Sequence, residues 1–328
     1  MKRREFIAGL GGAAVVGPRG AWGQQRDRVR QVGFLSGFPD NPDTRKQSTA
    51  FQEGMSALGW TDGRNVKLEF HYTAGDPERM RLLATEMVKS APDVILAAAT
   101  PVLAALYKET RTTPIVFVNV SDPVDGGYVA SMARPGGNVT GFTSFEYSLG
   151  GKWVELLKET VPSLTRILVL LNQENYTYRA LLRTIEGAAR SAGLHVTAAN
   201  VRNASQIEAA MDAFGRQPNG GVIVLPDPAT TVNLDQLLVA ATRNHLPTLQ
   251  SFRYFAARGG LLAYGTNNEE LYRRAAAYVD RILKGAKPSE LPVQNPTKYD
   301  LVINLKTAKA IGLSVSPLLL SRADEVIE

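Results

Sequence analysis

The chain contains no cysteine and only three histidines among its 328 residues. Without cysteine there can be no disulfide, no thiolate metal site and no cysteine nucleophile. The histidines, His71, His195 and His245, are scattered, and none has a carboxylate or second histidine at metal-ligand spacing. The sequence also lacks a P-loop and the Gly-x-Ser-x-Gly turn of serine hydrolases. We therefore expect no metal and no cofactor, and we favour a binding protein over an enzyme.

Long apolar runs and basic clusters are also missing. No stretch is apolar enough for long enough to form a transmembrane helix in a mature protein. The formal charge is +6, but residues 1–23 contribute four basic side chains and one acidic one, a balance of +3. The remaining excess is spread thinly, without a basic helix or a stripe of arginine and aromatic residues. We therefore expect no nucleic-acid partner.

The N-terminus has the features of an export signal. The arginine pair Arg3-Arg4 precedes a Gly/Ala-rich run, and the small residues Ala21 and Gly23 stand at the positions that a signal peptidase reads. This head resembles a twin-arginine signal, although Lys2 stands where that motif prefers Ser or Thr, so Sec export remains the alternative. We predict that residues 1–23 are removed and that the mature protein is periplasmic.

Buried strands alternate with helices through the first half of the chain. Three apolar segments, 31–35, 93–97 and 114–119, read as buried strands of a parallel sheet, and the alternating segment 65–70 reads as an edge or half-exposed strand. The segment 114–119 ends at the turn Ser121-Asp122-Pro123, which we expect to lead into a short helix and a glycine-rich segment. Residues 30–142 are therefore predicted to form a first lobe.

The same pattern returns at an offset of roughly 130 residues, which suits a duplicated domain. The corresponding strands are 166–171, 194–198, 221–225 and 245–250. The sequence therefore predicts an α/β fold of two doubly wound parallel-sheet lobes, the second spanning residues 145–264. A long helix from Asn268 would return the chain to lobe 1, so that 266–296 belong there. The lobe of residues 297–328 stays open.

Two segments, Val139–Phe142 and Leu261–Gly265, are predicted to cross between the lobes as hinge strands. We expect the hinge to involve two glycines, where the backbone turns or packs closely, and their polar or aromatic neighbours: Gly141, Thr143, Tyr264 and Gly265.

Four segments resemble one known family: Arg3-Arg4-Glu5-Phe6-Ile7, the turn Ser121-Asp122-Pro123, the run from Ala133 to Gly141, and the tail from Pro296 to Lys309. They are similar to the ABC transporter substrate-binding proteins of the family that includes aromatic amino-acid binders. The resemblance spans nearly the whole chain. It implies a type I periplasmic-binding fold whose lobes close on a small-molecule solute, and an ABC permease in the inner membrane as partner. We expect the chain to act as a monomer.

Solutes of open parallel sheets bind beyond the carboxyl ends of the strands, where helix N-termini offer free N–H groups. Ten residues at these ends are the candidate ligand contacts: Ser36, Thr100, Ser121 and Asp122 in the first lobe, and Asn172, Asn175, Tyr176, Asp227, Ser251 and Phe252 in the second. Their hydroxyls, carboxylates and rings suit a small zwitterion such as an amino acid.

Each candidate also has a plainer interpretation. The Ser36, Thr100 and Ser121 hydroxyls and the Asp122 carboxylate could simply be helix N-caps. A neutral solute would need neither the Asp122 nor the Asp227 carboxylate. Asp122 and Asp227 facing across a cleft could imitate a catalytic pair, which would make an enzyme on the same fold. A sensory module that reports to a membrane receptor would need the same closure, so the sequence leaves it open.

Overall fold

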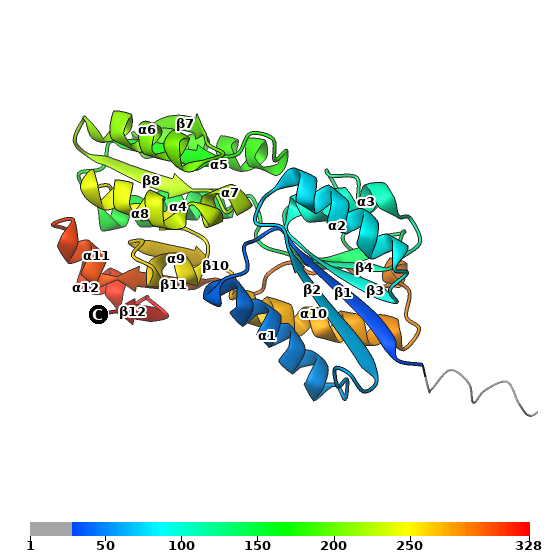
Figure 1. Ribbon diagram of the computed structural model, residues 1–328. Coiled ribbons are helices and arrows are strands. Elements are labelled where there is room, and N and C mark those ends of the chain that lie inside the picture. The colour runs from blue at the N-terminus through cyan, green and yellow to red at the C-terminus, as the bar shows by residue number, and fades with distance from the viewer. Residues whose placement is uncertain (1–27) are drawn as a thin grey trace, which may run out of the picture.

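Two parallel sheets organise the computed structural model, which describes residues 28–328 (Figure 1). The predicted export signal, residues 1–23, lies outside the described residues. The first sheet has the order β2-β1-β3-β4-β5, and all its pairings are parallel. Its strands are β1 (Arg30–Ser36), β2 (Val66–Tyr72), β3 (Val94–Ala98), β4 (Ile115–Val120) and β5 (Val139–Thr143).

Four helices cover this sheet and complete lobe 1: α1 (Pro42–Ala57), α2 (Pro77–Lys89), α3 (Thr100–Glu109) and α10 (Asn268–Leu283). Their apolar faces pack on opposite sides of the sheet. Phe51 of α1 and Tyr272 of α10 belong to one buried cluster, whereas Met87 of α2 and Leu103 of α3 belong to the other. The central strands β1, β3 and β4 are buried on both faces, which is why they read as apolar runs, whereas the edge strand β2 is half-buried and alternates.

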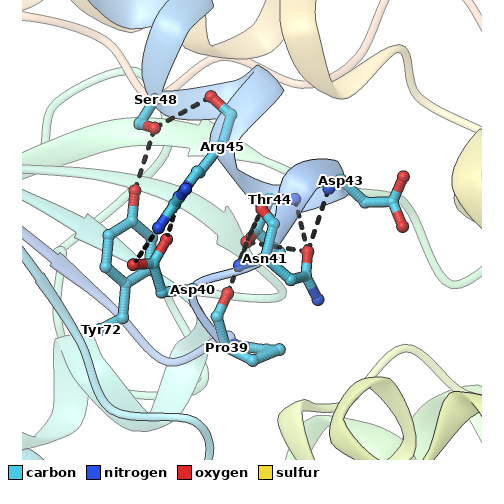
Figure 2. A network of polar contacts seen from close by, with 8 residues as sticks. All are labelled: Pro39, Asp40, Asn41, Asp43, Thr44, Arg45, Ser48 and Tyr72. Carbon is cyan, nitrogen blue, oxygen red and sulfur yellow. Dashed lines mark hydrogen bonds and ion pairs between the residues drawn. The ribbon is translucent and has the colours of Figure 1, made fainter.

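The start of α1 is fixed by a network of short-range polar contacts (Figure 2). The Asn41 side chain accepts hydrogen bonds from the backbone N–H groups of Asp43 and Thr44, both at 3.0 Å. Pro42 occupies the first helical position, where its missing N–H costs nothing. Asp43 points its carboxylate away from this network (Figure 2), which leaves it available to the other lobe.

The second sheet has seven strands in the order β12-β11-β10-β9-β8-β6-β7. They are β6 (Arg166–Leu171), β7 (His195–Asn200), β8 (Gly220–Val224), β9 (Thr248–Gln250), β10 (Leu262–Gly265), β11 (Asp300–Asn304) and β12 (Glu325–Ile327). From β7 to β10 the order repeats that of the first sheet, as a duplication predicts. Only the β10–β11 pairing is antiparallel. The two-lobe α/β fold predicted from the sequence is confirmed.

Helices cover both faces of the second sheet as well. They are α4 (Leu149–Thr160), α5 (Thr177–Ser191), α6 (Ala204–Gly215), α7 (Pro228–Val232), α8 (Leu234–Arg243), α9 (Arg253–Ala257), α11 (Leu305–Ala310) and α12 (Pro317–Leu320). The apolar faces of α4 and α5 pack on one side, around the fully buried Trp153, and those of α6 and α8 on the other. Across residues 28–328, the helices are too short or too polar to cross a bilayer.

The chain passes between the lobes three times: after β5, after β10, and between the 3-10 turn at Pro288–Glu290 and β11. The sequence predicted the first two crossings, and the third carries the last residues into the second sheet. The crossings are bonded together. Thr143 donates its N–H to the Gln294 carbonyl at 2.9 Å, and the Thr266 hydroxyl donates to the Ser144 carbonyl at 2.6 Å.

One local feature differs from the sequence prediction. The helix expected after Pro123 is absent: residues 123–127 form hydrogen-bonded turns instead.

Gly141 and Gly265 both lie where another backbone segment comes close. A Cβ on Gly141 would stand 2.2 Å from the Phe117 carbonyl oxygen, and a Cβ on Gly265 would stand 2.2 Å from that of Ser251. A side chain at either glycine would therefore push neighbouring strands apart.

Candidate solute site between the lobes

The carboxyl ends of both sheets meet between the lobes and enclose a small cavity, here called the interlobe cavity. Its wall comes from the loops after β1, β3 and β4, the first crossing, and the loops after β6, β8 and β9: Phe38, Ala99, Thr100, Pro101, Asn119, Ser121, Ser144, Phe145, Asn175, Tyr178, Pro226, Pro228 and Phe252. Its volume is about 10 Å³, room for about one water molecule. A larger occupant must therefore enter by separation of the lobes.

Four of the ten predicted residues line this cavity: Thr100, Ser121, Asn175 and Phe252. The Thr100 hydroxyl accepts from the Ser121 backbone N–H at 3.4 Å, and the Ser121 and Ser144 hydroxyls lie 3.4 Å apart. Thr100 is the first residue of α3, not its cap. The N-cap is Ala99, which provides no side-chain hydrogen bond. Only the Thr100 N–H is therefore left for another partner in this first turn, since Pro101 has no N–H and those of Val102 and Leu103 donate to the Ala99 carbonyl oxygen. With the positive end of the helix dipole, it suits an anionic group at the cavity wall.

An aromatic pair closes the cavity from both sides. The rings of Phe38 in lobe 1 and Phe252 in lobe 2 meet edge to face, with centroids 6.3 Å apart, and Ala99 completes the contact. Tyr254 packs against Phe252 from behind, at 5.5 Å between centroids. The cavity therefore combines an apolar wall with hydroxyl and amide groups, the composition of a small-molecule site.

Asp122 and Tyr176 meet each other outside the cavity wall. The Tyr176 hydroxyl donates to the Asp122 carbonyl oxygen at 2.9 Å. The Asp122 carboxylate accepts from the Tyr147 hydroxyl at 2.9 Å and from the Asp125 N–H at 3.0 Å. Burial and this carboxylate together raise the pKa of Tyr147, so the phenol stays protonated and donates. Both oxygens of Asp122 already have protein partners.

Asp227 has one carboxylate oxygen without a partner. The side chain is only 2% exposed; Oδ1 accepts from the Ala229 N–H at 2.9 Å, and Oδ2 has no hydrogen-bond partner among the described residues. Burial raises its pKa to about 6, although the Ala229 N–H and the nearby Asn172 side chain work in the opposite direction. Both neighbours in sequence, Pro226 and Pro228, line the interlobe cavity. Asp227 therefore caps α7 and also offers a free acceptor beside the cavity.

The remaining three predicted residues lie elsewhere. The Ser36 hydroxyl accepts from the Phe38 N–H at 3.2 Å, and the Asn172 side chain accepts from the Glu174 N–H at 3.2 Å. Ser251, just after β9, lines a separate groove. Among residues 28–328, no group of three or more His, Asp or Glu side chains is placed to hold a metal ion.

Comparison with known proteins decides the family. The model of the family described as "ABC transporter substrate binding protein" matches residues 36–327. The chain belongs to this family. It is 26% identical over 282 residues to a tyrosine-binding protein of Clostridioides difficile (strain R20291). The aligned region covers 85% of this chain and 80% of that protein. The resemblance seen in the sequence is thereby confirmed.

Solved structures of similar proteins share the fold. One is the ABC domain in complex with L-Trp from Streptococcus pneumonia, with a TM-score of 0.85, 24% identity, and coverage of 92% of this chain and 100% of that one. Another is the ligand-free, open structure of a substrate binding protein with adhesive properties from Clostridium difficile. It gives a TM-score of 0.67 and 23% identity, and covers 91% of this chain and 99% of that one. Family membership makes the chain a solute-binding protein of an ABC transporter rather than an enzyme.

Several cavity residues of this substrate-binding protein were not predicted, among them Phe38, Asn119, Phe145 and Tyr178. Asn119 sits at a strand end, where the rule that found Ser121 would also have found it, and its φ of +54° marks a strained position. Tyr178 lies inside the first turn of α5, and its hydroxyl donates to the Pro226 carbonyl. Its direction depends on helix phase, which the sequence does not define to one residue.

Proposed function

We propose that this protein captures a small amino-acid-like zwitterion between its lobes and delivers it to an ABC permease in the inner membrane. The family supports the transporter role. The observation that carries the solute class is the interlobe cavity, where the uncapped start of α3 faces aromatic and hydroxyl groups from both lobes. An importer needs capture and release of one small solute, and a site divided between two lobes provides both.

The solute's carboxylate would lie against the Thr100 N–H at the start of α3 and the hydroxyls of Thr100 and Ser121. Its ammonium group would bind the free oxygen of Asp227, because the oxygens of Asp122 are already engaged. The apolar part would meet Phe252 and Phe38, with Tyr176 holding the lobes together rather than contacting the solute. Relatives that bind tyrosine or tryptophan support an amino acid with a large side chain.

Closure would proceed about the three crossings, with Gly141, Thr143, Tyr264 and Gly265 at the hinge. The higher TM-score against the L-Trp complex than against the open structure, at nearly equal identity, supports a closed arrangement here. Small-angle scattering should show compaction when a verified solute saturates the protein. An unchanged radius of gyration would contradict hinged closure.

A thermal-shift screen against amino acids, sugars, nucleosides and small carboxylates tests the solute class. A solute at 100 times its dissociation constant should add about 2.7 kcal/mol to the free energy of unfolding. We expect aromatic or large apolar amino acids to give the largest shifts. Shifts from sugars or nucleosides alone would overturn the amino-acid proposal and leave the family role intact.

Export to the periplasm through the twin-arginine route is part of the proposal, because residues 1–23 carry Arg3-Arg4 before a Gly/Ala-rich run. N-terminal sequencing of the native protein should find a start near Gln24. Changing both arginines to lysine should block export; a normally exported double variant would indicate the Sec route instead.

A further inference from the structure

A second, larger space opens between the lobes beside α1, here called the α1 groove. Its volume is about 430 Å³. Lobe 1 contributes the first turns of α1 and α10. Lobe 2 contributes the segment after β9 together with β11 and the residues before β12. The groove is large enough for a small organic molecule, and both lobes are needed to complete it.

Buried polar groups in the groove wall have no partner within the described residues. Ser251 is 3% exposed, and its hydroxyl makes no hydrogen bond. Both amide atoms of Asn268, in the first turn of α10, are likewise buried and unpaired, and both residues line the groove. Buried polar groups in proteins are nearly always satisfied. Their presence on both sides of the groove, one from each lobe, points to an occupant that can both donate and accept hydrogen bonds.

The charges of the groove favour an ammonium group. Five acidic and three basic side chains line it. At the β11 end, Asp300 and Asp324 share a single cation, Lys298, at 2.7 and 3.1 Å. Arg253 is fully engaged by Glu325, with two contacts of 2.6 Å. Asp43 is likewise paired, with Arg258 outside the lining. The negative excess is therefore local to the β11 end, where two carboxylates share one cation, and no cluster in residues 28–328 is built for a metal ion. We propose that the α1 groove is a second binding site, for a small hydrophilic organic ammonium compound.

One segment separates the two sites. Ser251 and Phe252 are consecutive, and their side chains face opposite ways: Ser251 lines the α1 groove and Phe252 lines the interlobe cavity. Tyr254 lines the groove and packs on Phe252 at 5.5 Å between centroids. An occupant of the groove touches both lobes, so it binds the closed arrangement best. The two sites are then linked, and each ligand raises the affinity for the other by the same factor. This linkage rests on the proposed function.

The matched probes are ethanolamine and ethylene glycol, which differ in the ammonium group and are otherwise of similar size. Ligand-observed NMR titration of the purified protein should show saturable ethanolamine binding at least fivefold tighter than that of ethylene glycol. Asn268→Leu and Ser251→Ala should each weaken ethanolamine at least threefold. Arg243→Gln, which breaks only the surface pair with Asp212 within lobe 2, should leave ethanolamine affinity within twofold.

Three outcomes would overturn the site. They are the absence of saturable ethanolamine binding, equal affinity for both probes, and an Arg243→Gln variant that loses ethanolamine as strongly as Asn268→Leu does. The solute screen is independent: failure to find an amino-acid solute would sink the proposed function while ethanolamine binding still stood. With a verified solute, saturating ethanolamine should tighten its binding; an unchanged dissociation constant would disprove the linkage.

Discussion

The Tyr176 hydroxyl of lobe 2 donates a hydrogen bond to the Asp122 carbonyl oxygen of lobe 1 at 2.9 Å. Asp122 has a φ of +43°, a left-handed conformation that few non-glycine residues adopt, and its carboxylate is held by Tyr147. Two tyrosines of one lobe thus contact a single strained residue of the other. These contacts exist only while the lobes are together, so they stabilise the closed arrangement specifically.

Tyr176→Phe should therefore shift the lobes toward the open form and weaken solute binding. A net hydrogen bond contributes about 0.5–1.5 kcal/mol, so we expect a two- to tenfold loss of affinity by calorimetry. The control is Tyr278→Phe, whose hydroxyl donates to the Pro292 carbonyl at 2.7 Å within lobe 1. That variant should lose stability without losing affinity, and equal affinity losses in both would refute the closing role.

The Arg258 guanidinium bridges the lobes at another point. One of its nitrogens contacts Asp43 of α1 at 3.0 Å, and another contacts Asp235 of its own lobe at 2.6 Å. Arg258→Gln should lower the closed population by up to about 1 kcal/mol, the range of partly exposed ion pairs, and high salt should mask the effect. Arg243→Gln, which breaks the Asp212 pair within lobe 2, is the matched control. Scattering or interlobe fluorescence transfer measures the difference.

The fold could be predicted because its signals are local. A buried parallel strand shows as a continuous apolar run, and the run at 115–120 is fully buried in β4. The repeat of strand and helix along the chain then indicated the duplication. The third crossing was not predicted, because residues 294–300 carry no periodic pattern and are held by bonds to residues distant in sequence, such as Gly141, Thr143 and Glu146.

The sequence could predict the region of the site but not the individual side-chain contacts within it. Strand ends located Thr100, Ser121, Asn175 and Phe252 at the cavity. They could not show that Ser251 and Phe252 face different spaces, nor that Asp122 is satisfied by Tyr147, which is distant in sequence. Those facts depend on how the lobes sit against each other, which strand and helix patterns do not encode.

Substitution of Gly265 tests how tightly the second crossing, at the end of β10, is packed. A Cβ there would stand 2.2 Å from the Ser251 carbonyl oxygen, although its backbone conformation is open to other residues. Gly265→Ala should therefore lower the free energy of unfolding by about 1–3 kcal/mol through overpacking. Gly137→Ala, where nothing lies within 4 Å of the added Cβ, should change it by less than about 0.5 kcal/mol. Urea unfolding compares the two, and similar stabilities would disprove the packing argument.

The buried carboxyl group of Asp227 should make the free energy of unfolding depend on pH. Its pKa rises from 3.8 to about 6 on folding, because burial disfavours the charged form. Between these values the folded protein binds a proton that the unfolded chain has lost, so stability falls as pH rises through this window. Above pH 6 the cost is about 3 kcal/mol, to order of magnitude. Asp227→Asn should remove most of it, so the variant should unfold at higher urea than wild type at pH 7.5 and differ less at pH 4.5.

Asp227→Asn should also bind solute more weakly. A variant that is more stable than wild type yet binds solute less tightly is the sharpest test of the ammonium assignment. Losing the charged partner of a buried ammonium typically costs about 2–5 kcal/mol, so affinity should fall at least about tenfold. In the wild type, an ammonium beside Oδ2 favours the ionised carboxyl, so affinity should rise between pH 5 and 7. Asp212→Asn is the control, because that carboxylate pairs with Arg243 within lobe 2 and lies outside the site. If Asp227→Asn leaves affinity within about twofold and pH-independent, the solute carries no ammonium there, and a neutral solute becomes the better proposal.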